Sequence, residues 1–227
     1  MELVSRAFQK NPVWVIVPAK SLSQAKSRLS SALSPQQRME LVTRLLQHTL
    51  EVLHNLIKVG ELAGILVISS DPLILDEAQK YGALILEEES GSETERLSES
   101  EHLNKALLTA TSWLFAHQSV NRLLILPVDL PLLNEISLRA LLSLSTDASA
   151  VITTDQSGTG TNVLLLPAGL ARDFPYSFGL GSFQAHRQII LDRGVNLKEA
   201  ALPDLMFDLD QTKDLVRLPT RLKEDLW

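Results

Sequence analysis

The chain contains no cysteine, and this absence excludes several classes of protein. Without cysteine there is no disulfide framework, no thiolate metal site and no cysteine nucleophile. Such a chain fits a reducing compartment, so we expect a cytoplasmic protein. The sequence also lacks a run of 18 apolar residues and a signal-peptide pattern, so we expect neither membrane insertion nor export.

Positive charge is also scarce. The 21 Lys and Arg residues are outnumbered by 27 Asp and Glu residues, which gives a net charge of −6 and a pI of about 5.4. A nucleic-acid-binding surface needs clustered Lys and Arg, so we expect no nucleic-acid partner. A small anionic substrate stays open, because a few well-placed cations can reverse the local field in a cleft.

Several motifs of known chemistry are absent as well. The sequence has neither the GxGxxG motif of dinucleotide-binding folds nor the GxxxxGK[ST] motif of P-loop proteins. The five His residues show no HxxxH or HExxH spacing, so we assign none of them to metal binding or catalysis. Only His186 lies near one of the candidate sites described below.

The apolar segments predict one α/β domain over residues 1–227, with residues 1–11 as a loose N-terminal extension. Unbroken apolar runs are typical of strands buried on both faces, as in a mostly parallel sheet. We expect strands at 13–17, 65–69, 83–86, 122–127, 150–154, 163–166 and 195–202, the last at an edge. We expect helices at 34–58, 71–81, 102–117, 135–144, 183–193 and from about 212. This order predicts a mostly parallel mixed sheet flanked by helices, joined by right-handed crossovers.

Three cations follow the first predicted strand and the Pro18 after it. They are Lys20, Lys26 and Arg28. Their place matters because the ligands of open α/β sheets bind beyond the carboxyl ends of the strands. Lys and Arg at that place would neutralise the phosphates of a nucleotide. The alternative is a solvated loop that only connects the strand to the next helix.

Two carboxylates, Asp129 and Asp210, each follow an apolar segment, so folding could bring them together at one edge of the sheet. Two carboxylates plus substrate phosphates are the ligands that Mg²⁺ commonly accepts. The alternative is that Asp129 is a turn residue and Asp210 the N-cap of the last helix. Asp208 fits either a ligand or a neighbour of the ligands.

Two glycine-containing loops supply further candidates. In the loop 158–162, Thr161 offers a hydroxyl, although a plain hairpin turn explains the same residues. In the loop 178–182, Gly179 precedes Ser182, which we expect as the N-cap of a helix whose free amides could bind phosphate or carboxylate. A simple capped helix is the alternative there. Asn104 lies in the first turn of its predicted helix, where it either contacts a ligand or caps that helix.

Taken in this order, the motifs resemble those of the 2-phospho-L-lactate or phosphoenolpyruvate guanylyltransferases of coenzyme F-420 biosynthesis. That family is a branch of the nucleotidyltransferase superfamily that includes the molybdenum-cofactor guanylyltransferases. The matching segments are VPAK at 17–20, AKSRL at 25–29, LSPQQR at 33–38, LPVDLP at 126–131, GTGTN at 158–162, FGLGSF at 178–183 with His186, and DLD at 208–210. The resemblance spans about residues 13–215.

The resemblance implies a Rossmann-like nucleotidyltransferase domain that transfers GMP from GTP to the phosphate of a three-carbon phospho-acid and releases pyrophosphate. GTP and the phospho-acid would be its partners and Mg²⁺ its cofactor. By family likeness, the triphosphate would be held by Lys20, Lys26 and Arg28, the nucleotide also by Pro18 and Asn104, Mg²⁺ by Asp129 and Asp210, and the acceptor by Thr161, Gly179 and Ser182.

Two departures from the family pattern leave alternatives open. The loop 87–101 is longer and more acidic than expected, so the choice of base is open, and the residues after Asp210 differ from the usual Asp-Thr-Pro-Glu-Asp ending. The alternatives are a nucleotidyltransferase that uses CTP, or a sugar-phosphate or pterin acceptor, and a non-catalytic nucleotide-binding module. The identity of the acceptor and the oligomeric state, a homodimer included, also stay open.

Overall fold

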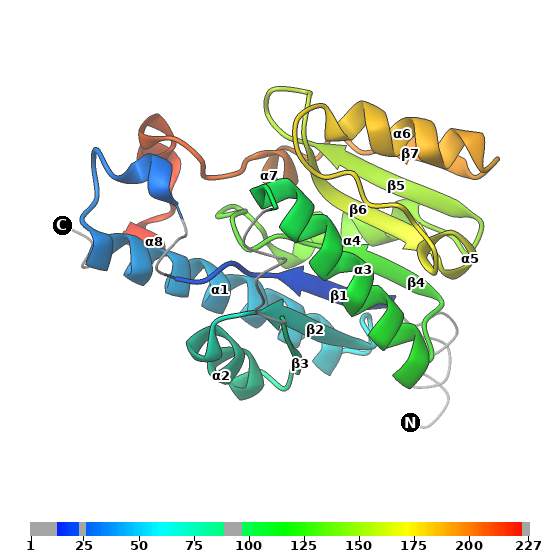
Figure 1. Cartoon of the computed structure of the whole chain (residues 1–227), viewed down its shortest axis with the longest axis horizontal. Helices are drawn as coiled ribbons and strands as arrows, with labels where there is room; N and C mark the ends of the chain where they lie inside the picture. Colours follow the sequence, from blue (N-terminus) through cyan, green and yellow to red (C-terminus); the bar gives the residue numbers. More distant parts are fainter. Residues whose placement is uncertain (1–12, 23–25, 89–96, 224–227) are drawn as a thin grey trace.

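The computed structural model describes residues 13–22, 26–88 and 97–223, which form a twisted sheet with helices on both faces (Figure 1). The predicted extension, residues 1–11, lies outside the described residues. Within them, seven strands have the order β3-β2-β1-β4-β6-β5-β7. The strands are β1 (Val13–Pro18), β2 (Gly64–Ser69), β3 (Leu84–Glu87), β4 (Arg122–Ile125), β5 (Ser149–Thr154), β6 (Thr161–Pro167) and β7 (Asn196–Glu199).

Strand β1 lies at the centre of a parallel block. It pairs in parallel with β2 on one side and with β4 on the other, and β2 pairs in parallel with β3. Among the strands described, only β6 runs antiparallel to its neighbours, β4 and β5, whereas β7 lies parallel to β5 at the edge. The predicted mixed, mostly parallel sheet is therefore confirmed.

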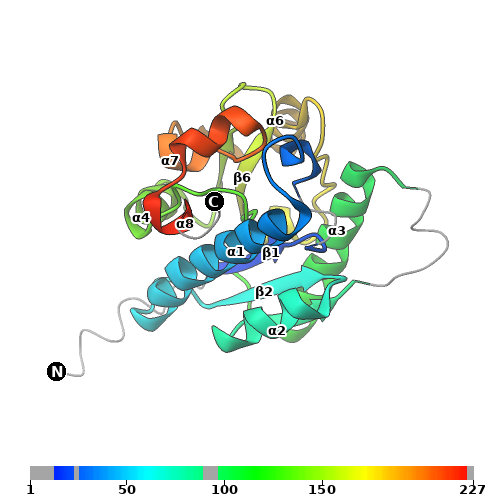
Figure 2. The same ribbon diagram turned by 90° about the vertical axis from the view of Figure 1, so that its left-hand side faces the viewer.

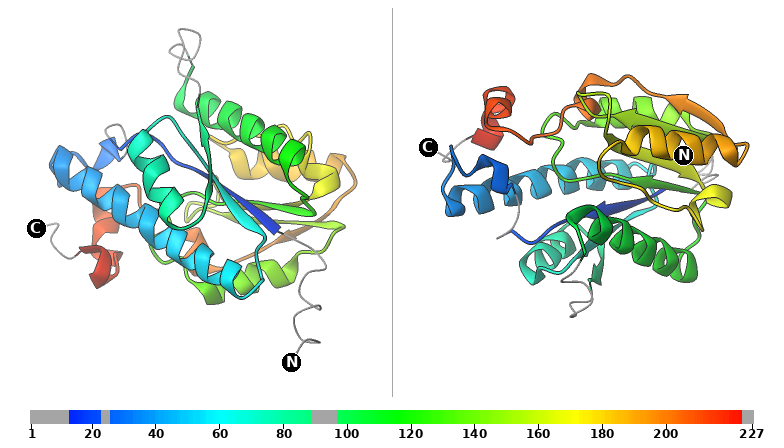
Figure 3. Two further views of the ribbon diagram at one scale, coloured as in Figure 1. Left: turned by 90° about the horizontal axis from the view of Figure 1, so that it is seen from below. Right: turned by 45° about the horizontal axis from the view of Figure 1, so that its top comes forward.

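Helices cover both faces of this sheet. They are α1 (Pro35–Lys58), α2 (Pro72–Lys80), α3 (Glu99–His117), α4 (Glu135–Leu144), α5 (Ala168–Ala171), α6 (Ser182–Asp192), α7 (Pro203–Met206) and α8 (Thr220–Lys223), with the 3-10 helices η2 (Ser27–Leu29) and η4 (Thr212–Arg217). Helices α1, α2, α4 and α7 pack in one apolar core, and α3, α5 and α6 in the other. Figure 3 shows α1 and α3 on opposite sides of β1.

The unbroken apolar run of β1 has a simple explanation in these two cores. Val15 and Val17 point into the core between the sheet and α1, whereas Trp14 and Ile16 point into the core between the sheet and α3. Because successive side chains of a strand alternate between faces, a strand covered on both sides needs an apolar residue at every position.

Local capping decides where two of the helices begin. Ser34 caps α1 as predicted: its hydroxyl accepts the Gln37 N–H (3.2 Å), and the Gln37 side chain accepts the Ser34 N–H (2.8 Å). Helix α3 begins at Glu99 instead of near residue 102, because Ser98 and Glu101 form a second capping box.

Proline explains two differences from the sequence prediction. The strand predicted at 122–127 ends at Ile125, since Pro127 has no N–H to continue the ladder. The helix predicted from about residue 212 is divided into η4 and α8, with Pro219 between them. The edge strand predicted at 195–202 is the shorter β7, Asn196–Glu199.

A third, smaller core joins the C-terminal segment to the beginning of α1. Its members are all leucines: Leu29, Leu33, Leu41, Leu45, Leu209, Leu215, Leu218 and Leu222. Figures 1 and 2 show the last described residues, in red, beside the N-terminal half of α1. This packing carries the chain past the ends of β1 and β4 and so positions residues 208–210. None of the helices described is long and apolar enough to cross a membrane.

Candidate active site

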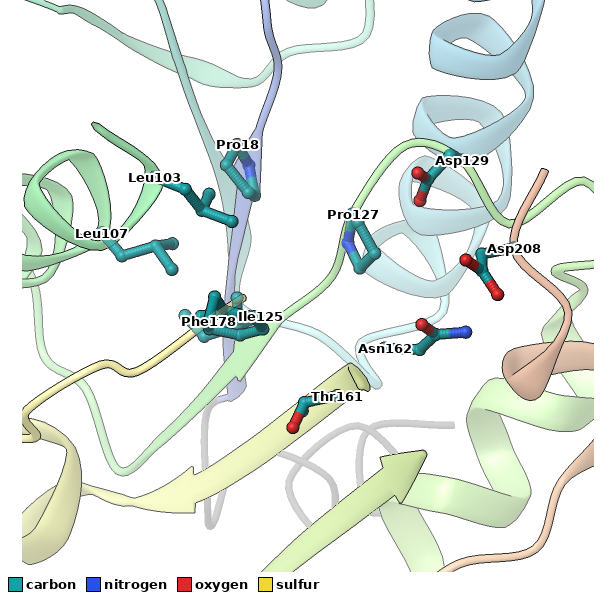
Figure 4. Close-up of a pocket in the computed structure, with 10 residues that line it drawn as sticks. All are labelled: Pro18, Leu103, Leu107, Ile125, Pro127, Asp129, Thr161, Asn162, Phe178 and Asp208. Atoms are coloured by element: carbon teal, nitrogen blue, oxygen red, sulfur yellow. The ribbon is translucent and has the colours of Figure 1, made fainter. Parts of the chain in front are cut away.

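A pocket opens at the edge of the sheet where β1 and β4 end (Figure 4). It is lined by Pro18, Leu103, Leu107, Ile125, Pro127, Asp129, Thr161, Asn162, Phe178 and Asp208. The chain leaves β1 toward β2 on one side, while β4 flanks β1 on the other, so the strand order reverses here. Open α/β sheets bind their ligands at such a switch point. Because β6 is antiparallel, its first residue, Thr161, lies at the same edge.

The predicted acidic residues are brought together beside this pocket. The N–H of Leu209 donates to the carbonyl of Asp129 over 2.9 Å, which ties the C-terminal segment to the turn after β4. The ammonium of Lys26 then bridges both carboxylates, at 2.8 Å from Asp129 Oδ2 and 3.2 Å from Asp210 Oδ1. Arg28 lies 3.4 Å from Asp210 Oδ2. Two predicted cations and both predicted carboxylates thus form one charged cluster.

Lys26 is the most enclosed cation of this cluster, with a side chain only 11% exposed. Burial lowers the pKa of Lys26, but the charges of Asp129 and Asp210 outweigh burial and raise it above the ordinary value for lysine. The backbone of Lys26 has a φ of 54°, a left-handed conformation that costs a non-glycine residue about 1–2 kcal/mol. The ion pairs of Lys26 with Asp129 and Asp210 offset this cost.

Asp208 also belongs to the site, and the sequence had left its role open. It lines the pocket beside Asp129, whereas Asp210 faces Lys26 and Arg28. Burial raises the pKa of Asp208 to about 6, and the charges of Asp129 and Asp210 add to this rise. Leu209 between the two acids is fully buried. An apolar residue buried between two acids leaves both acids free to face the site, so this Asp-Leu-Asp pattern is the signal that the sequence offers for Asp208.

The carboxylates could hold a magnesium ion. Asp129 and Asp210 already converge on one cation, the ammonium of Lys26, so their oxygens face a common point. In the part of the chain that the structure describes, no group of three or more His, Cys, Asp or Glu residues could hold a metal by itself. Mg²⁺ commonly binds through one or two carboxylates and takes its other ligands from water and substrate phosphates, which matches this donor set.

Lys20 lies apart from the acidic cluster. Its ammonium is 2.8 Å from Glu99 Oε2, and its side chain is half exposed. The hydrogen bond from Lys20, and then its charge, lower the pKa of Glu99. Glu99 opens helix α3, so this pair links the exit of β1 to that helix. Sequence reasoning assigned Glu99 to a loop and did not identify this contact.

Asn104 clamps the main chain of Phe178. Its amide oxygen accepts the Phe178 N–H over 2.8 Å, and its amide nitrogen donates to the Phe178 carbonyl over 3.1 Å. Because α3 begins at Glu99, Asn104 lies in the second turn, not in the first as predicted. Its predicted contact with the nucleotide stays a prediction; the contact present fixes the ring of Phe178 in the pocket wall.

The predicted N-cap role of Ser182 is wrong. Gly181, with a φ of 74°, is the N-cap of α6, and Ser182 is the first helical residue. The Ser182 hydroxyl instead accepts the main-chain N–H of Thr161 over 2.8 Å, and this residue is only 1% exposed. The local sequence favours a serine cap, but the left-handed glycine before it turns the chain so that the hydroxyl meets β6.

Gly179 is the position in this loop where a side chain would not fit. Its φ is 128°, and an added Cβ would stand 3.0 Å from the Cβ of Ser100. Both the backbone conformation and the close approach to α3 require glycine. The loop 178–182 is therefore held between α3 and β6 with little freedom to shift.

Comparisons with known proteins show which family this chain resembles. A family model described as "Guanylyl transferase CofC like" matches residues 13–220. A phosphoenolpyruvate guanylyltransferase of Rubrobacter xylanophilus is 38% identical over 208 residues, which cover 91% of this chain and 93% of that protein. A 2-phospho-L-lactate guanylyltransferase of Methanothermobacter thermautotrophicus is 31% identical over 201 residues, 88% of this chain and 81% of that one.

The fold also has relatives among solved structures. A nucleotidyl transferase from Methanothermobacter thermautotrophicus superposes with a TM-score of 0.61, at 14% identity, over 93% of this chain and 98% of that chain. At this identity the likeness shows the fold alone, a nucleotidyltransferase-type α/β domain.

Proposed function

The chain belongs to the family of CofC-like guanylyltransferases, and on that premise we propose that it transfers GMP from GTP to a three-carbon phospho-acid with release of pyrophosphate. The acceptors we propose are phosphoenolpyruvate and 2-phospho-L-lactate, the compounds named in its relatives. From the resemblance of the motifs, we also propose that the reaction belongs to coenzyme F-420 biosynthesis. The observation that carries the proposal is the meeting of Lys26, Asp129 and Asp210 at the switch point of the sheet.

The chemistry asks little of the protein beyond alignment and charge. The attacking group is a phosphate oxygen that is already anionic, so no general base is required. What remains is to hold two highly charged substrates close together and to neutralise the charge that develops at the α-phosphorus and on the departing pyrophosphate. A site of clustered cations and carboxylates suits this task better than the nucleophile-base pair of a hydrolase.

We propose that Asp129 and Asp210 hold Mg²⁺, with Asp208 beside them, and that Lys20, Lys26 and Arg28 bind the triphosphate. The bound ion would supply positive charge to the phosphate oxygens. With Asp129 and Asp210 engaged in this way, Lys26 and Arg28 would pair with phosphate oxygens in place of the carboxylates they contact here, so their charges would stay paired.

The remaining residues divide between the two substrates. Pro18 and Asn104 are proposed for the nucleotide, with Leu103 and Leu107 as the apolar wall of the pocket. Thr161, Gly179 and Ser182 are proposed for the acceptor. GTP is a metabolite of the cytoplasm, and we place the reaction there.

The experiment is an assay of pyrophosphate release by the purified protein with Mg²⁺, each of the four nucleoside triphosphates, and each acceptor in turn. We expect turnover with GTP and phosphoenolpyruvate or 2-phospho-L-lactate to exceed that with the other nucleotides. Equal turnover with CTP, or turnover only with a sugar phosphate or pterin, would contradict the assignment. Nucleotide binding without turnover on any acceptor would favour the non-catalytic module.

A further inference from the structure

A buried histidine, His186 of α6, lies directly behind the proposed acceptor residues, and the reaction as described does not use it. Its side chain has no exposed surface. Its ring packs edge-on against Phe178, with 4.6 Å between ring centroids, and also contacts Phe174. Burial lowers the pKa of His186 to about 4, so the ring is neutral near pH 7.

The hydrogen bonds of this ring determine which nitrogen carries the proton. The main-chain N–H of Ser177 points at Nε2 over 2.9 Å. A main-chain N–H can only donate, so Nε2 is the accepting, unprotonated nitrogen. A neutral imidazole then carries its proton on Nδ1. Nδ1 lies 3.0 Å from Thr161 Oγ1, so His186 donates and Thr161 accepts.

This direction has a consequence for the Thr161 hydroxyl. A hydroxyl has a single proton and two lone pairs. Because one lone pair is engaged by His186, the proton of Thr161 is turned away from the ring, and Thr161 lines the pocket (Figure 4). Phosphate and carboxylate groups of a fully ionised phospho-acid only accept hydrogen bonds, so they need a hydroxyl presented in this sense.

We propose that His186 is a positioning residue that donates from Nδ1 to Thr161 and thereby presents the Thr161 hydroxyl as a hydrogen-bond donor to an oxygen of the phospho-acid. The identity of that ligand rests on the proposed function. Through Nε2 the same ring also holds the main chain at Ser177, next to the Phe178 that Asn104 clamps. His186 therefore makes two hydrogen bonds: the bond from Ser177 fixes the tautomer of the ring, and the bond to Thr161 sets the direction of the Thr161 proton.

Two substitutions separate these contacts. In His186→Asn, the side-chain amide stands near the place of Nδ1 and keeps a donor for Thr161, but it does not reach Ser177. In His186→Gln, the amide oxygen stands near the place of Nε2 and keeps an acceptor for Ser177, but Thr161 loses its donor. We expect His186→Gln to raise the KM for the phospho-acid about tenfold or more, as for the loss of a hydrogen bond to a charged group. We expect His186→Asn to restore that KM to within about threefold of the wild-type value, with the KM for GTP little changed in both.

A second buried histidine provides the control. His48 in α1 is also nearly inaccessible and bonds to Arg221, away from the residues that line the pocket. His48→Gln removes a buried ring at a comparable cost in folding, and we expect both KM values to stay at the wild-type level. A rise in acceptor KM for His48→Gln equal to that for His186→Gln would reduce the effect to general destabilisation and overturn the proposal.

The proton position can be measured without turnover. In ¹⁵N NMR spectra of the substrate-free wild-type protein, we expect the His186 ring to carry its proton on Nδ1 and none on Nε2, with the signal assigned from the His186→Asn spectrum. A proton on Nε2 would overturn the proposal even if His186→Gln does not fold. A wild-type protein inactive on every acceptor would refute the proposed function. An active wild-type protein with the same acceptor KM in His186→Gln and His186→Asn would refute only the role of His186.

Discussion

The two sides of the site are built on different physical principles. The acidic side joins Lys26, Arg28, Asp129 and Asp210 by ion pairs that are open to water at Arg28 and Asp210, which are 75% and 41% exposed, and more enclosed at Lys26, which is 11% exposed. The side proposed for the acceptor is neutral and buried, and Ser182 and His186 there are 1% and 0% exposed. Ion pairs near solvent can exchange partners at little cost. Buried neutral hydrogen bonds cannot, because each group left unpaired costs about 1–3 kcal/mol.

This difference teaches how one pocket can serve two substrates. The charged side is suited to reorganise around a charged ligand, since each cation there is paired with a carboxylate that an anion could replace. The neutral side is preformed, since its donors and acceptors are fixed by β6, α6 and α3 before any ligand binds. The predictions below are arranged by the size of the effect that each should have on one side or the other.

The largest effect should come from Asp129, where the charged side meets the pocket. Asp129→Asn keeps the shape of the side chain but removes the charge, and we expect turnover to fall about a hundredfold or more, as for the loss of a key electrostatic group. Steady-state rates at saturating GTP and Mg²⁺ measure this. Asp173→Asn is the matched control, because Asp173 is an exposed acid paired with Arg193 and should leave the rate unchanged. Full activity of Asp129→Asn would remove Asp129 from the mechanism.

Acid should weaken the folded state through its buried neutral histidines. The pKa values of His48 and His186 are lowered from 6.5 to about 4, so between these values the unfolded chain binds more protons than the folded one. Their contribution to stability is present above pH 6.5 and is lost as the pH falls toward 4. At about 1.4 kcal/mol per pKa unit, each histidine should remove roughly 3 kcal/mol over this range.

Urea unfolding at pH 7 and at pH 4.5 measures that loss. We expect His186→Gln to show a smaller loss of stability on acidification than the wild-type protein, because it lacks one of the two titrating groups. Because the pKa of Asp208 is raised to about 6, its protonation in the folded state offsets part of the loss over the same range, so the comparison with His186→Gln isolates the ring. An equal loss in the two proteins would mean that the His186 ring is accessible to protons in the folded state.

Lys26 should reveal whether its ammonium and a metal ion compete for the same oxygens. In Lys26→Met the carboxylates of Asp129 and Asp210 lose their shared partner, so we expect Mg²⁺ alone to raise the melting temperature more than it does in the wild-type protein. We also expect kcat/KM for GTP to fall about tenfold, as for the loss of one charged contact to phosphate. Lys20→Met is the control for the response to Mg²⁺ alone, because Lys20 pairs with Glu99 and not with these acids. An identical response to Mg²⁺ in all three proteins would separate the metal from this cluster.

A substitution at Gly179 should have the smallest effect, and it tests whether the neutral side is preformed. Gly179→Ala places a Cβ at a φ of 128° and 3.0 Å from Ser100, so we expect a loss of about 1 kcal/mol or more of folding free energy. Thermal unfolding measures it. Adding Ser100→Gly should recover only part of the loss, since it relieves the contact but not the backbone strain. Complete recovery would show that the contact alone requires glycine.

Part of this molecule follows directly from its sequence. The run from Val13 to Val17 predicts a doubly covered strand, and Ser34 with Gln37 predicts the start of α1, because burial and capping act on neighbouring residues and leave a local pattern. The order of the motifs is enough to indicate the family, because each motif is a short local run of residues. The same reasoning placed Asp129 and the early cations at one edge of the sheet, since the carboxyl ends of parallel strands share an edge.

Tertiary structure alone decided how these residues are paired. Nothing local in the sequence shows that Lys26 bridges Asp129 and Asp210, that Asn104 holds the main chain of Phe178, or that the Ser182 hydroxyl serves β6 instead of its own helix. Each contact joins residues far apart in the chain, and its partner depends on strand register and on the path of the C-terminal segment over α1. Local pattern determines which elements form and which residues are candidates. Packing between distant segments determines which hydrogen bonds and ion pairs those candidates make.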